Sequence, residues 1–129
     1  MNLLVLLGRV LFSLIFVMSG VTHITGSGAD YAASAGVPAA NILVPLAGLL
    51  SLLGGLSILL GFKARLGAWL LVIFLVPVTF YMHKFWGIPD KMTAQMQMAM
   101  FMKNVALLGA ALMVAYFGAG PLSMDGRRS

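Results

Sequence analysis

The sequence predicts an all-α polytopic membrane protein: one domain, residues 1–129, with four transmembrane helices in an up-down-up-down bundle. Of its 129 residues, 61% are hydrophobic and only 9% are charged, whereas a soluble domain has about 45–50% apolar and about 25% charged residues. The mean hydropathy of +1.04 excludes both a water-soluble and a disordered chain. Four apolar stretches each reach the roughly 20 residues that cross a hydrocarbon core about 30 Å thick.

The first span covers about residues 3–24. Its apolar core exceeds the roughly 7–15 residues of a signal peptide and no cation precedes it, so we expect a retained helix. The second span covers about residues 42–62 and contains small residues at intervals of three or four, a spacing that lets helix backbones approach closely. These residues form two rows, Ala47, Ser51 and Gly55 in one, and Gly54, Ser57 and Gly61 in the other.

The third span covers about residues 66–86 and the fourth about residues 97–117. Pro45 and Pro77 lie inside the second and third spans, where neighbouring helices can satisfy the freed carbonyl groups. Every connection is short except residues 25–40, which could hold one short interfacial helix. Short connections favour antiparallel neighbours, and this predicts the up-down-up-down order.

Basic residues are unequally divided between the two sides of this predicted bundle. The side that holds both termini carries Lys63, Arg65, Arg127 and Arg128, with Arg9 close to it, and the other side carries Lys84 and Lys91. Because cytoplasmic segments are enriched in Lys and Arg, we predict that both termini are cytoplasmic.

Several function classes are excluded by composition. The net charge is +5, but the basic residues are scattered at the ends of apolar runs, so we predict no binding to nucleic acid. Cysteine is absent, which excludes disulfides, thiolate metal sites and iron–sulfur clusters. The carboxylates of Asp30, Asp90 and Asp125 lie outside the spans, so we predict no catalytic residues and not an enzyme by itself.

Ionisable and amide groups inside the spans are the candidate functional residues, because a charge at mid-bilayer costs roughly 2.5–3.5 kcal/mol. His23, His83, Lys103 and Asn104 map to the outer half of the predicted bundle. Arg9 lies on the same helix face as His23, and Trp86 lies one turn beyond His83 on the predicted third helix. Together these six residues form a predicted polar ligand site. Its residues are His83, Lys103, Asn104, His23, Arg9 and Trp86.

Structural roles for the same residues remain open. Arg9 and Lys103 could snorkel to the head groups, and the histidines and Asn104 could bond neighbouring helices. Trp86 could be an ordinary interfacial aromatic residue.

Two cofactor alternatives have partial support. Met92, Met96 and Met100 align on one helix face, and thioethers suit Cu(I), but methionine is also an ordinary packing residue. His23 and His83 on separate helices could ligate a haem, although nothing further supports one. We therefore predict neither copper nor haem, and no metal site.

Several short segments follow one another along the chain in a characteristic order and spacing: residues 8–12, 16, 19–20 and 23, then 35–38, 54–55 and 61, then 79–86, 103–109 and 118–125. In this order and spacing they resemble the DoxX family of small bacterial membrane proteins over essentially the whole chain. One position departs from the family, since many members carry Lys where His23 stands.

The resemblance implies a four-helix membrane fold and an association with respiratory and oxidative-stress systems. Relatives include a quinone-linked thiosulfate oxidoreductase subunit and a scaffold of a membrane oxidoreductase complex. We therefore predict a protein of the bacterial inner membrane that associates with other membrane subunits of a redox system and contacts a quinone. A quinone carbonyl needs a hydrogen-bond donor in an apolar slot, which His83, Lys103 and Asn104 could supply. A metal-handling or small-solute carrier and a purely structural membrane anchor remain as alternatives.

Overall fold

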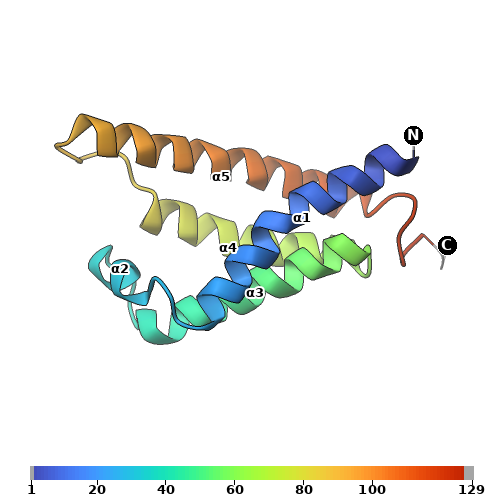
Figure 1. Ribbon diagram of the computed structural model, residues 1–129, viewed down its shortest axis with the longest axis horizontal. Coiled ribbons are helices and arrows are strands. Elements are labelled where there is room, and N and C mark those ends of the chain that lie inside the picture. Colours follow the sequence, from blue (N-terminus) through green and yellow to red (C-terminus); the bar gives the residue numbers. More distant parts are fainter. Residues whose placement is uncertain (1, 127–129) are drawn as a thin grey trace.

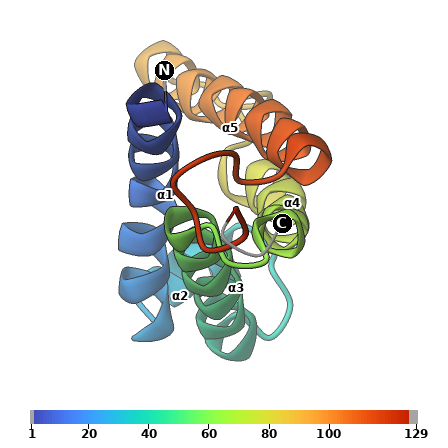
Figure 2. The ribbon, with the colours of Figure 1, turned by 90° about the vertical axis from the view of Figure 1, so that its right-hand side faces the viewer.

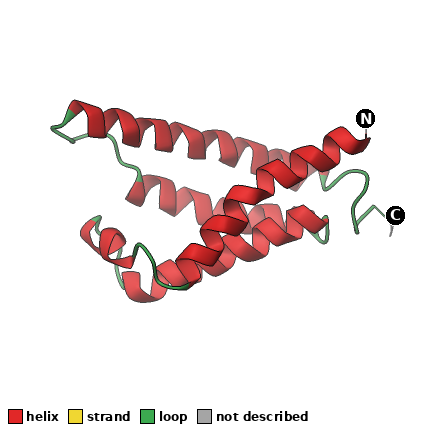
Figure 3. Ribbon diagram, in the orientation of Figure 1, coloured by secondary structure: helices red, strands yellow, loops and turns green. Residues whose placement is uncertain are grey.

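The computed structural model describes residues 2–126, and within them the regular secondary-structure elements are all helices (Figures 1 and 3). The elements are α1 (Asn2–Ile24), α2 (Ala29–Ser34), α3 (Ala40–Leu60), α4 (Ala64–Met82) and α5 (Lys91–Phe117). All but α2 are long and apolar enough to cross a membrane. The predicted all-α fold with four transmembrane helices is therefore confirmed, and α2 is the short helix of the long connection.

Two helix ends differ from the predicted spans. Helix α4 ends at Met82, not near residue 86, because His83 leaves the helical conformation with φ −124°. Helix α5 begins at Lys91, not near residue 97, because the Asp90 carboxylate accepts a hydrogen bond from the Thr93 backbone N–H at 3.0 Å and caps the helix. Arg127 and Arg128, which were used to predict the orientation, lie outside the described residues.

The long helices pack in sequence order: α1 on α3, α3 on α4, and α4 on α5. Figures 1 and 2 show that the start of α1, the α3–α4 turn and the segment after α5 lie at one end of the bundle, here called the tail end. Helix α2 and the α4–α5 loop lie at the other end, here called the α2 end. Toward the α2 end, α1 and α5 diverge (Figure 1).

Small residues of α3 let its two neighbours approach closely. Ser51 donates a hydrogen bond to the Phe16 carbonyl of α1 at 2.7 Å, and Gly48 and Gly55 lie on the same side of α3, against α1. Ser51 and Gly55 of the predicted row thus contact α1 and Gly48 joins them, while Ala47 packs against the hydrophobic core.

Gly54 and Ser57 of the second row face α4, where a β-carbon on Gly54 would lie 2.7 Å from Leu71. The third member, Gly61, instead faces the side chain of Arg9 and Ser123.

Residues 118–126, here called the tail, fold back over the tail end of the bundle (Figure 2). The backbone N–H groups of Met124 and Asp125 donate to the carbonyls of Leu60 and Gly61 at 3.1 and 2.7 Å. The Asp125 carboxylate accepts from the backbone N–H groups of Lys63 and Ala64 at 2.8 and 3.0 Å. The tail therefore satisfies polar groups that the end of α3 and the start of α4 cannot pair within their own helices.

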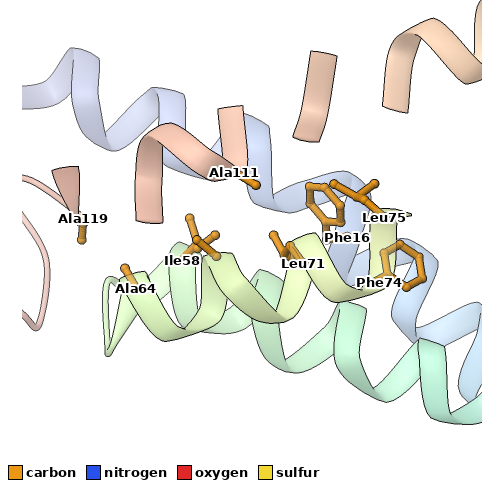
Figure 4. Close-up of a cluster of buried hydrophobic side chains, with 9 residues drawn as sticks. Phe16, Ile58, Ala64, Leu71, Phe74, Leu75, Ala111 and Ala119 are labelled. Carbon is orange, nitrogen blue, oxygen red and sulfur yellow. The ribbon is translucent and has the colours of Figure 1, made fainter. Parts of the chain in front are cut away.

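The hydrophobic core occupies the tail half of the bundle (Figure 4). Its buried residues are Phe16, Ile58, Ala64, Ala68, Leu71, Phe74, Leu75, Ala111 and Ala119. At its inner limit the rings of Phe16 and Phe74 meet edge to face, with centroids 6.4 Å apart. Beyond these two rings lies a cavity, and a second, smaller cluster of buried residues, Ala32, Ala40 and Val44, lies at the α2 end.

Candidate functional site

A cavity of about 570 Å³ lies next to Phe16 and Phe74, on the side of the α2 end, and all four long helices contribute to its walls. Most of the lining is aliphatic or aromatic. The polar side chains that line it are Ser19, His23, Tyr81, His83, Lys103 and Asn104. An apolar slot with a few polar groups is the usual form of a small-molecule site, and such sites span about 300–1,000 Å³.

Four of the six predicted site residues line this cavity. His23 comes from α1, His83 follows the last residue of α4, and Lys103 and Asn104 come from α5. The helix packing therefore brings together residues that are up to 81 positions apart in the sequence.

Arg9 and Trp86 do not line the cavity. The Arg9 side chain is buried at the tail end, where its guanidinium donates a hydrogen bond to the Leu122 carbonyl of the tail. Trp86 lies in the α4–α5 loop, 51% exposed, and its ring meets those of Phe85 and Phe101 edge to face. Because α4 ends at Met82, His83 and Trp86 also do not continue a helix face from Thr79.

The imidazole of His23 is held within its own helix. Its Nδ1 lies 2.6 Å from the Ser19 carbonyl oxygen and 3.1 Å from the Ser19 hydroxyl. A carbonyl oxygen only accepts, so Nδ1 must carry a proton. In the neutral ring, Nε2 is then a hydrogen-bond acceptor.

His83 is fixed by a chain of hydrogen bonds between α2, α4 and α5. The Tyr31 hydroxyl donates to the Met82 carbonyl at 3.2 Å and accepts from the Gln97 amide at 3.2 Å. The Gln97 amide oxygen is then the group 3.0 Å from His83 Nδ1, so this nitrogen is the donor. As in His23, the neutral ring keeps Nε2 as an acceptor.

Sequence reasoning missed the two residues that hold His83. Gln97 stood at the predicted start of the fourth span, but it lies about 1.7 turns inside α5. A glutamine inside an apolar helix was the available signal. Tyr31 carried no such signal, because only the folding of α2 against α3 brings it to Met82.

Asn104 and Lys103 of α5 line the cavity with few hydrogen-bond partners of their own. Asn104 is only 5% exposed, and its amide makes no hydrogen bond within residues 2–126. The Lys103 ammonium contacts the Met100 sulfur at 3.7 Å. Buried amides normally have partners, so an unpaired amide in a cavity wall is available to a ligand.

The described residues contain no group of three His, Cys, Asp or Glu side chains placed to hold a metal ion. Met92, Met96 and Met100, which align on one face of α5, are 71%, 60% and 40% exposed. None of these three methionines lines the cavity.

Comparison with known proteins adds two findings. The family model described as DoxX matches residues 4–84, which include His23 and His83. The inner membrane protein YphA of Escherichia coli (strain K12) is 29% identical over 126 residues, which cover 96% of this chain and 89% of that protein. No solved structure matches the chain significantly.

Proposed function

The chain belongs to the DoxX family, and on this basis we propose that it is an accessory subunit of a redox system that holds a quinone head group in its cavity. The similarity to a relative named as an inner membrane protein supports a location in the bacterial inner membrane. The four apolar helices support an environment of lipid.

The proposal rests on one observation: apolar walls surround a small set of hydrogen-bonding groups in a single cavity. A quinone has a flat apolar ring with two carbonyl oxygens that accept hydrogen bonds. Lys103 and Asn104 have free donors for such an oxygen. The reduced form carries hydroxyl groups, and these can donate to Nε2 of His23 or His83.

The packing of the helices supports entry from the lipid phase. Helices α1 and α5 both line the cavity, yet they diverge toward the α2 end (Figure 1). Quinones are dissolved in the bilayer, so a cavity lined by membrane-spanning helices suits them. The chain has no cysteine, and we assign the electron transfer to partner subunits of the redox system.

The test is to measure the quinone that co-purifies with the full chain in a mild detergent. We expect the wild type to retain quinone and Asn104→Leu to retain about tenfold less, because one ligand hydrogen bond contributes about 1–1.5 kcal/mol. Asn41→Leu is the matched control, since Asn41 is exposed at the start of α3, away from the cavity.

Two results would count against the proposal. One is a wild type that holds no quinone and whose melting temperature does not rise with added short-chain quinone. The other is equal retention by Asn104→Leu and Asn41→Leu, which would favour the structural-anchor alternative.

A further inference from the structure

The residues that line the cavity include a lysine, two histidines and an asparagine, but no Asp or Glu. We infer that the preferred ligand of the cavity is an acidic amphiphile, with an oxygen anion on an apolar body. This inference rests on the proposed function, because it concerns the head group of the ligand in the same cavity.

All three carboxylates of the chain lie away from the cavity. Asp30 is exposed on α2. Asp90 accepts hydrogen bonds from Thr93 at the start of α5, and Asp125 accepts from the start of α4 at the tail end. None of them is a cavity counter-ion for Lys103.

Lys103 also lies far from either end of its helix. It follows Lys91 by twelve residues and precedes Phe117 by fourteen, which corresponds to about 18 and 21 Å along the helix axis. An ammonium at this depth is costly without a partner. The Met100 sulfur at 3.7 Å is only a weak acceptor and carries no charge.

An anionic head group would complete this set of side chains. Its negative charge would pair with the Lys103 ammonium, and the unpaired Asn104 amide could donate to its oxygen. A charge-assisted hydrogen bond is roughly twice as strong as a neutral one. The apolar walls would surround the rest of the ligand, and Nε2 of either histidine could accept a hydrogen bond from the head group when it is protonated.

Two kinds of molecule share this chemistry, a quinone with an ionised ring hydroxyl and a long-chain carboxylate. Binding to the purified full chain in a neutral detergent distinguishes them, with empty micelles as the blank. The first pair of probes is a 2-hydroxy-3-alkyl-1,4-naphthoquinone, ionised at neutral pH, and its uncharged 2-methoxy ether. The second pair is decanoate and decanol.

We expect the hydroxyquinone to bind at least tenfold more tightly than its methyl ether. Lys103→Met should remove this preference, and Lys103→Arg should keep it. Lys103 is exposed in the isolated chain, so these variants should fold, and their melting temperatures check this. Lys84→Met is the control, because Lys84 is also exposed and basic but does not line the cavity.

The outcomes separate this inference from the proposed function. If both quinones bind equally, or the methyl ether binds better, the inference is wrong and the quinone site stands. If neither quinone binds but decanoate binds better than decanol in a Lys103-dependent way, the inference stands and the quinone proposal fails. If no probe binds, both are wrong.

Discussion

The crossing of α1 and α3 at Gly48 allows a sharp test of the packing. A β-carbon on Gly48 would lie 2.6 Å from the backbone nitrogen of Ile24 and 2.8 Å from the β-carbon of His23. Ordinary contacts begin at about 3.4 Å, so Gly48→Ala requires the two helices to separate by about 0.8 Å. The closest atom belongs to the backbone, and a change of side-chain rotamer cannot relieve the clash.

The magnitude follows from two opposing effects. Overpacking of this kind costs about 1–3 kcal/mol, and a rigid backbone neighbour favours the upper end of that range. Alanine recovers up to about 1 kcal/mol relative to glycine through its higher helix propensity. We therefore expect Gly48→Ala to lower the free energy of unfolding by about 2 kcal/mol, which is roughly a 30-fold change in the unfolding equilibrium.

The assay is thermal unfolding in mild detergent, followed by circular dichroism. Gly109→Ala is the matched control, because Gly109 is also helical and a β-carbon there would meet nothing within 4 Å. The control should be neutral or slightly stabilising. If Gly48→Ala melts at the same temperature as Gly109→Ala, the close approach of α1 and α3 at this point is refuted.

Three further predictions concern the helix ends and the orientation. Asp125→Ala should lower the free energy of unfolding by about 1 kcal/mol in the same melting assay, because α4 loses its cap; an unchanged melting temperature would contradict that role. The Thr93 hydroxyl, and to a smaller extent the Thr93 backbone N–H, donate hydrogen bonds that lower the pKa of Asp90. The ionised Asp90 carboxylate therefore stabilises the folded state above its unfolded-state pKa of about 3.9, and this stabilisation is lost as the pH falls through the lower pKa of the folded state. Acidification from about pH 6 to pH 3 should therefore reduce the melting temperature less in Asp90→Ala than in the wild type, and equal reductions would rule this out. A reporter fused to the C-terminus should be active in the cytoplasm, and a periplasmic signal would reverse the predicted orientation.

The fold was predictable because it depends on properties that the sequence displays directly. Hydropathy identified the four spans, and short connections gave their order. The ends of α4 and α5 were harder to place, since hydropathy does not report where a helix stops. The Asp90–Thr93 spacing was a readable start signal for α5, but no glycine or proline marks the end of α4 between Met82 and Trp86.

The candidate site was only partly predictable for a different reason. His23, His83, Lys103 and Asn104 could be grouped because each is polar at a similar predicted depth in the bundle. The partner of Arg9 is a backbone carbonyl 113 positions away, and residues of every type offer the same carbonyl group. Residue identity therefore could not reveal that Arg9 contacts the tail and not the cavity.

The docked tail also constrains the order in which the molecule can be completed during synthesis. Backbone groups at the end of α3 and the start of α4 have partners in Met124 and Asp125, which leave the ribosome only after all of α5. More than fifty further residues are therefore translated before these partners can reach the α3–α4 turn. Until then the end of α3 is closed by the local bonds of Gly61 and Phe62 to Ile58 and Ser57, and water must hydrate the groups that the tail later pairs.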